Sequence, residues 1–150
     1  MKRLAKYKKL FEVEQEMTLS GLKSTYRKLV KEWHPDKFQE DNPLKQEAEM
    51  RSTEIIDAYH FLVSIAPETL EQHKEEYMQT ISTSGIADFL YKGVTLKVTF
   101  QNGSVYEYFG VQQNNYKKFL HAPSPERFAR RHIFNAHTYR NVSKAVEEAV

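Results

Sequence analysis

Two stripes of apolar residues, one on each side of a proline, constrain the fold of the first half of the chain. Residues 22–33 carry apolar side chains at i, i+4, i+7 and i+11, the spacing of one helix face, and residues 44–65 repeat this pattern. Pro35 ends the first helix, because the residue before a proline is pushed out of the α region. Two long helices joined by a short turn pack antiparallel, so the sequence predicts a helical hairpin. The stripes are Leu22, Tyr26, Leu29 and Trp33, and Ala48, Ser52, Ile55, Tyr59 and Leu62.

Shorter elements surround the predicted hairpin. The polar residues 37–43 suit the loop between its two helices. Apolar residues spaced over 7–13 indicate a short first helix that packs across the pair. Pro67 ends the third helix, and residues 68–79 are expected to form a fourth, exposed helix rich in glutamate.

The spacing of apolar residues changes in the second half of the chain. Apolar and polar side chains alternate over residues 94–100, which is strand spacing. Asn102-Gly103 then favours a tight hairpin turn into a return strand at residues 105–109. Residues 86–91 suit a further strand.

This change of pattern indicates two modules. Helical spacing resumes after Gly110, and Ser124-Pro125-Glu126 has the cap, proline and acidic residue of a helix start. We therefore expect an α+β chain with an all-α domain at residues 1–79, a Ser/Thr-rich linker at 80–85 and a small α+β domain at 86–150. The second domain is expected to hold two or three antiparallel strands and two helices.

Composition excludes several classes of function. The chain has no cysteine, which excludes disulfides, thiolate metal sites and thiol nucleophiles and fits a reducing cytoplasm. No apolar run approaches the roughly 20 residues of a membrane-spanning helix. His132 and His137 are five residues apart, which does not place both on one helix face for a metal, and no phosphate-binding glycine loop is present. We therefore expect a cytoplasmic protein that is not an enzyme and takes no metal or other cofactor.

The tripeptide His34-Pro35-Asp36 lies where the predicted hairpin turns. In isolation it could be no more than a helix stop followed by a turn. In its context, however, the chain closely resembles the J domain of the DnaJ family over about residues 5–77. The matching stretches are residues 7–13, 26–29, 33–37 and 55–59, with Leu62.

The resemblance implies a co-chaperone that binds a DnaK-type ATPase chaperone and stimulates its ATP hydrolysis. It assigns the trigger to His34, Pro35 and Asp36. Pro35 fixes its own backbone angle, and the Asp36 carboxylate can accept a bidentate arginine from the partner. Basic side chains on the preceding helix steer an acidic partner and speed the encounter. The docking charges that the resemblance implies are Lys23, Arg27 and Lys28, with Lys31 as a fourth.

Some features depart from the family pattern. Ser52 stands where J domains usually carry an aromatic residue, so the core there is looser or Met50 fills the space. Trp33 replaces the usual tyrosine and keeps an aromatic side chain. The glycine- and phenylalanine-rich region and the zinc-finger cysteines of larger DnaJ proteins are missing. A J-like scaffold that no longer triggers ATP hydrolysis is therefore an alternative.

The second half resembles another family, the KTSC domain, over residues 84–142. This module also occurs at the C-terminus of some lysyl-tRNA synthetases, but the resemblance implies no molecular role. The residues that carry it are 96–100, 102–103, 106–108, 110–111, Tyr116, 119–120, Ala122, Ser124, Phe128, Ile133 and Tyr139.

Charge is distributed unevenly along the chain. Residues 1–77 carry 13 Lys/Arg and 15 Asp/Glu, whereas residues 78–144 carry 9 and 3. The basic region could bind a protein client, or it could bind nucleic acid with Tyr106 or Tyr108 stacking on a base. Alternatively, the alternating aromatic residues form one buried face of a strand, and the basic residues only keep the surface soluble. The main expectation is a co-chaperone with a C-terminal adaptor module, and the second is a nucleic-acid- or ribosome-associated protein. The candidate surface residues are Lys117, Lys118, Arg127, Arg130, Arg131, Arg140 and Lys144.

Overall fold

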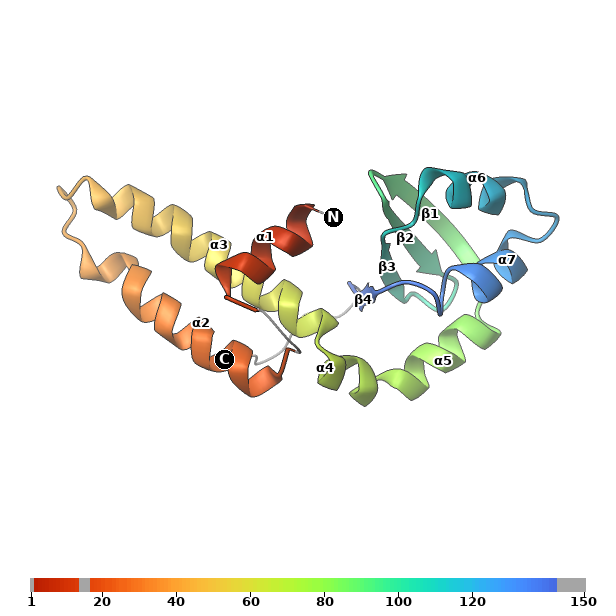
Figure 1. Cartoon of the computed structure of the whole chain (residues 1–150), viewed down its shortest axis with the longest axis horizontal. Coiled ribbons are helices and arrows are strands. Elements are labelled where there is room, and N and C mark those ends of the chain that lie inside the picture. The colour runs from red at the N-terminus through yellow and green to blue at the C-terminus, as the bar shows by residue number, and fades with distance from the viewer. Residues whose placement is uncertain (1, 14–16, 143–150) are drawn as a thin grey trace. The chain divides into compact units, whose positions relative to one another are not determined.

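The computed structural model describes residues 2–13 and 17–142, and the chain divides into two compact units. Among the described residues, the N-terminal unit comprises residues 2–69 and the C-terminal unit comprises residues 70–142. The division falls within a short helix, and each unit is described here by itself (Figure 1).

The N-terminal unit is the expected helical hairpin with a helix packed across it (Figure 1). The Thr18 side chain caps the second helix by accepting a hydrogen bond from the Gly21 N–H at 3.1 Å. The third helix begins at Leu44 and ends at Ile65, as its stripe predicts. The elements are α1 (Lys2–Leu10), α2 (Leu19–Trp33), η1 (Pro35–Lys37), α3 (Leu44–Ile65) and the start of α4 (Pro67–Gln72).

Stacked aromatic rings form the centre of this unit. The rings of Tyr26 and Tyr59 lie parallel with centroids 4.1 Å apart, and Tyr59 is 3% exposed. On α3, Ser52 is partly buried. Met50 is 69% exposed, so the expectation that it could fill the space beside Ser52 is wrong. Its position in the helical repeat turns it away from α2.

The C-terminal unit is built on an antiparallel sheet with the order β1-β2-β3-β4. The α+β class is confirmed, and the described residues hold one strand more than expected. The fourth strand has three residues, too few to produce a periodicity. Gly103 adopts a φ of 90° in the turn between β2 and β3, a conformation that favours glycine. The strands are β1 (Ile86–Lys92), β2 (Thr95–Phe100), β3 (Val105–Phe109) and β4 (Tyr139–Asn141).

Three helices pack on one face of this sheet: α5 (Lys74–Thr83), α6 (Gln113–His121) and α7 (Pro125–His132). The sequence led us to expect the last two only. Residues 68–79 were expected to be an exposed helix and residues 80–85 a linker. Instead α5 runs to Thr83, and its Tyr77 and Ile81 are 2% and 3% exposed in the core of the C-terminal unit. The Ser/Thr-rich composition of this segment concealed the two apolar positions one helical turn apart.

The Tyr77 hydroxyl ties α5 to the rest of this core. It donates a hydrogen bond to the Phe134 carbonyl at 2.5 Å and shares another, 3.1 Å long, with the Tyr108 hydroxyl. Burial raises the pKa of Tyr77 and of Tyr108 far above the ordinary value, and it raises the pKa of Tyr106 to about 12. The core is therefore built around neutral tyrosines whose hydroxyls have partners.

The C-terminal unit is expected to require α5 for folding. A fragment of residues 70–150 should fold, whereas residues 84–150 should not, because the shorter fragment lacks Tyr77 and Ile81. In the full chain, Tyr77→Ala should lower the free energy of unfolding of this unit by about 3–5 kcal/mol, the usual cost of truncating a buried aromatic residue. The exposed neighbour Met78 provides the control, since Met78→Ala should change it by less than about 0.5 kcal/mol. The chemical-shift dispersion of the methyl groups of β2 and β3 shows whether each fragment folds. Native dispersion in the fragment of residues 84–150 would contradict this account.

The buried tyrosines should also make the C-terminal unit sensitive to alkali. Because the folded pKa is raised, their contribution to stability is fully present below pH 10, where tyrosines of the unfolded chain ionise. It is lost as the pH rises, and for Tyr106 this loss extends to about pH 12. In that interval, each such tyrosine should lower the free energy of unfolding by about 1.4 kcal/mol per pH unit. Tyrosinate absorbance and near-ultraviolet circular dichroism should then change together; ionisation of these tyrosines with the sheet intact would contradict the prediction.

Candidate functional site

The His34-Pro35-Asp36 tripeptide forms a rigid turn directly after α2. His34 leaves the helix with φ −61° and ψ 128°, and Pro35 begins the 3₁₀ turn η1. The Lys37 N–H donates to the His34 carbonyl and the Phe38 N–H donates to the Pro35 carbonyl, each at 3.0 Å. The proline therefore both ends α2 and starts a hydrogen-bonded turn, which holds the tripeptide in one backbone geometry.

Side chains within the turn add to this order. His34 Nδ1 accepts a hydrogen bond from the Asp36 N–H at 3.1 Å, which leaves Nε2 as the ring nitrogen available to donate to a partner. The Asp36 carboxylate lies 3.7 Å from the same ring nitrogen. The His34 side chain is 50% exposed and that of Asp36 is 87% exposed. The turn thus fixes a ring edge and presents a carboxylate to solvent, where a cationic side chain of a partner can reach it.

The basic residues expected to dock a partner lie on α2. Arg27, Lys28 and Lys31 are exposed, and Lys23 is partly buried. Within the described ranges, none of these four makes an ion pair with a carboxylate within 4.0 Å. Because no described carboxylate pairs with them at short range, these side chains present positive charge on the same helix that ends in the turn.

Two contacts on the elements that flank the tripeptide were not predicted from the sequence. The Arg51 guanidinium lies over the Trp33 ring, 4.7 Å from its centroid, and its Nε donates to Glu47 at 3.1 Å. The Asn42 side chain accepts from the Leu44 N–H at 2.8 Å at the start of α3. The i,i+4 spacing of Glu47 and Arg51 was a usable signal for the ion pair. Nothing in the sequence indicated the stacking on Trp33.

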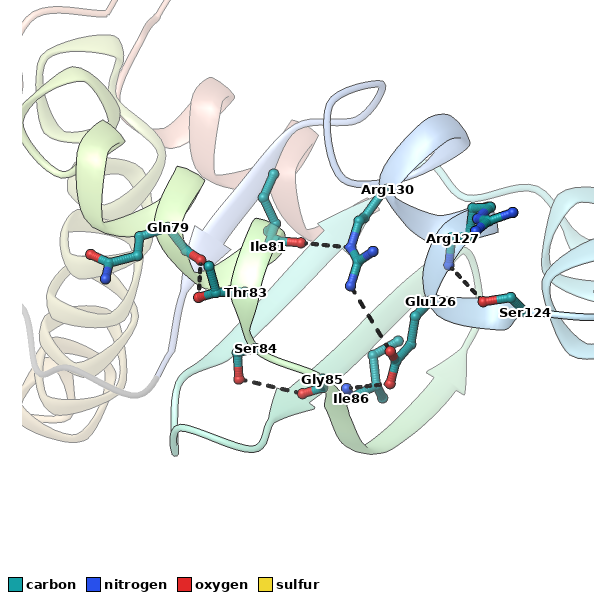
Figure 2. Close-up of polar contacts among 10 residues, drawn as sticks. All are labelled: Gln79, Ile81, Thr83, Ser84, Gly85, Ile86, Ser124, Glu126, Arg127 and Arg130. Carbon is teal, nitrogen blue, oxygen red and sulfur yellow. Dashed lines mark hydrogen bonds and ion pairs between the residues drawn. The ribbon is translucent and has the colours of Figure 1, made fainter.

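One of the expected surface arginines has a structural task in the C-terminal unit. Arg130 Nε donates to the Ile81 carbonyl at 3.0 Å, and its guanidinium lies 4.0 Å from Glu126. Glu126 in turn accepts from the Ile86 N–H at 3.0 Å (Figure 2). In this way α7 fixes the end of α5 and the start of β1. The Ser124 cap of α7, expected from the sequence, accepts from the Arg127 N–H at 3.3 Å.

The remaining candidate residues of the basic region differ in their exposure to solvent. Arg140 pairs with Glu107 at 3.1 Å across β3 and β4, and both side chains are mostly buried. Tyr106 and Tyr108 are 2% and 0% exposed, so neither ring can stack on a base. The exposed residues are Lys117 and Lys118 on α6 and Arg127 and Arg131 on α7, and Lys144 lies outside the described residues.

The described part of the chain has neither a metal-binding cluster nor a membrane-spanning helix. Residues 2–13 and 17–142 contain no group of three or more His, Asp or Glu side chains arranged to hold a metal ion. Over the same ranges, every helix is too short or too polar to cross a lipid bilayer.

A helical hairpin with a His-Pro-Asp turn and a basic preceding helix defines the first unit as a J domain. Comparison with protein families agrees, because residues 6–77 match the DnaJ domain and residues 82–146 match the KTSC domain. The chain therefore carries a DnaJ domain followed by a KTSC domain, and both resemblances seen in the sequence are confirmed.

Several DnaJ proteins match part of this chain. The chain is 43% identical over 63 residues to the chaperone protein DnaJ of Thermotoga petrophila, which covers 41% of this chain and 16% of that protein. It is 41% identical over 56 residues to the DnaJ of Thermoplasma acidophilum, covering 37% of this chain and 14% of that protein. Human DnaJ homolog subfamily B member 3 is 38% identical over 56 residues, which is 37% of each chain. No solved structure matches the chain.

The contact between Arg51 and Trp33 should be measurable, because Trp33 is the one tryptophan in the sequence. Arg51→Ala should expose the indole, shift its fluorescence emission to longer wavelength and destabilise the N-terminal unit by about 0.5–1 kcal/mol. Glu47→Gln removes the ion pair and keeps the stacking, so its emission should match the wild type. An unchanged spectrum for Arg51→Ala would mean that the guanidinium does not cover the ring in solution.

Proposed function

We propose that the protein is a DnaJ-type co-chaperone that binds a DnaK-type ATPase chaperone and stimulates its ATP hydrolysis, without itself catalysing a reaction. The observation that carries this proposal is the His34-Pro35-Asp36 turn, ordered by its own hydrogen bonds and exposed at the end of a basic helix. The matched relatives are DnaJ proteins, of which the chain spans 14 to 37% of the length.

Two kinds of residue contribute to binding in this proposal. The cations of α2 attract an acidic surface of the chaperone and raise the association rate, which should therefore fall with ionic strength. The turn then makes the short-range contact, in which the Asp36 carboxylate accepts a bidentate arginine. Because the backbone of the turn is already ordered, little conformational entropy is lost when it binds.

Stimulation of ATP hydrolysis requires a preference for one state of the chaperone. A ligand shifts a conformational equilibrium only by the difference between its affinities for the two states. The proposed contact of the turn must therefore be stronger with the hydrolysing conformation than with the resting one. Residues 82–146 are proposed to act as an adaptor that selects the client, and the whole is proposed to work in the cytoplasm.

Single-turnover ATP hydrolysis by a DnaK-type chaperone tests the proposal. The wild-type protein should accelerate hydrolysis, and His34→Gln should lose about tenfold or more of that acceleration, equivalent to about 1.4 kcal/mol of transition-state stabilisation. The loss is expected because the amide cannot reproduce both the ring edge and the Nδ1 acceptor for the Asp36 N–H. His121→Gln is the matched control, since His121 is exposed on α6 in the other unit and should leave the acceleration unchanged.

Two results would argue against this function. Equal acceleration by the wild type and His34→Gln would mean that the turn is not the trigger. If the wild type accelerates none of several chaperones tested, the J domain acts as a scaffold. Circular dichroism of each variant must match the wild type, so that a loss of folding is not read as a loss of function.

A further inference from the structure

Strand β1 forms an open edge of the sheet in the C-terminal unit. It lies at one end of the strand order and pairs with β2 alone among the described residues. It is seven residues long and contains neither proline nor glycine. Such an edge presents unpaired N–H and C=O groups and is a ready template for another strand.

One face of β1 belongs to the core of the unit. The Phe89 ring packs edge-on against Phe119, with centroids 5.1 Å apart. The Tyr91 ring stacks on Tyr116 at 4.0 Å, and its hydroxyl donates to the Val111 carbonyl at 2.6 Å. The partly buried Tyr91 and the 37% exposed Phe89 thus attach β1 to α6.

The opposite face of β1 carries an apolar residue between two opposite charges. Asp88, Leu90 and Lys92 alternate with the core-facing residues and are all exposed, Leu90 by 63%. On β2, Leu90 stands opposite the exposed Lys97, so the sheet offers it no apolar neighbour there. A large apolar side chain at the middle of a free edge is the kind of feature that proteins usually avoid or use for association.

The backbone of β1 fixes which groups point away from β2. The Phe89 N–H is bound by the Asp88 carboxylate at 2.8 Å, so it faces the open edge. Directions alternate along a strand, and therefore the backbone groups of Tyr91 face the same way while those of Leu90 face β2. The groups open to a new strand are thus those of Phe89 and Tyr91, on either side of Leu90.

We propose that two copies of this chain associate through β1, pairing antiparallel about Leu90 to join their sheets into one. In this register Phe89 of each copy lies opposite Tyr91 of the other. The two pairs formed in this way each exchange two backbone hydrogen bonds. Leu90 then faces Leu90 of the other copy in a close, non-hydrogen-bonded pair.

Charge complementarity favours this register and this occupant. Pairing about Leu90 sets Asp88 opposite Lys92 of the other copy, and Lys92 opposite its Asp88. Pairing about Asp88 or about Lys92 would instead set like charges against each other, which is destabilising. A strand that is complementary to itself in one register fits a second copy better than an extended segment of a client.

The same carboxylate that covers the edge takes part in the association. In a single copy the Asp88 carboxylate accepts from the Phe89 N–H and so occupies a donor that another strand would need. In the pair, that N–H passes to the Tyr91 carbonyl of the other copy, and Asp88 turns to Lys92 of the other copy. Because one strand pair buries less than a standard interface, the association should be weak, with a Kd on the order of micromolar or above.

Charge-reversal variants of the full chain test the proposal by sedimentation velocity over a range of concentrations. Asp88→Lys alone and Lys92→Asp alone should each weaken self-association by about tenfold or more. The double swap Asp88→Lys with Lys92→Asp should restore it. An equimolar mixture of the two single variants should also associate, because each supplies the charge that the other needs. Lys74→Asp, an exposed change on α5, is the control and should associate like the wild type.

Each other outcome overturns the proposal. A wild-type chain that remains monomeric at several hundred micromolar has no such interface. Association that neither single variant weakens uses another surface. If the chain is monomeric and the β1 amides become protected from hydrogen exchange only when an unfolded client is added, the edge binds a client segment instead. These measurements do not depend on ATP hydrolysis, so they are independent of the proposed co-chaperone function.

Discussion

The N-terminal unit depends on the stacking of Tyr59 between two other rings. Tyr26 of α2 lies parallel to it at 4.1 Å, and Phe11, directly after α1, lies nearly parallel at 6.2 Å. Aromatic contacts of this kind add about 0.5–1.5 kcal/mol each to the area that they bury. More important for function, the stack fixes the rotation of α2 about its axis. Once Tyr26 faces α3, Arg27, Lys28 and Lys31 face solvent, and Trp33 at the end of α2 lies beside Arg51 of α3.

Much of this unit and its candidate site could be predicted from sequence. Helical spacing is a strong signal over long segments. Together with Pro35 and Pro67, it predicted the extent of α3 and the end of α2 just before Pro35. The turn residues could also be predicted, because the consequence of a proline is local. The contact between Arg51 and Trp33 could not, since the two residues are 18 positions apart and meet only when the hairpin closes.

Prediction failed where tertiary packing decides the structure. Residues 80–83 resemble a linker in composition, yet they complete α5 because Tyr77 and Ile81 have a core to enter. Strand β4 has three residues and exists through its pairing with β3. The basic charge of residues 78–144 also gave no sign that two of its arginines have structural partners. Arg130 and Arg140 are held by a carbonyl and by Glu107, respectively, and only the folded chain brings those groups within reach.

The hydrogen bond from Tyr77 to Phe134 sets an order of events during synthesis of the chain. Its two residues are 57 positions apart, so a ribosome adding roughly 5–20 residues per second needs about 3–11 s to travel from one to the other. Among the described residues, the N-terminal unit lies within residues 2–69 and can fold during this interval. The nascent α5 must wait, with Tyr77 and Ile81 in water. The first half of the protein is therefore complete on the ribosome while the second half is still an unprotected chain.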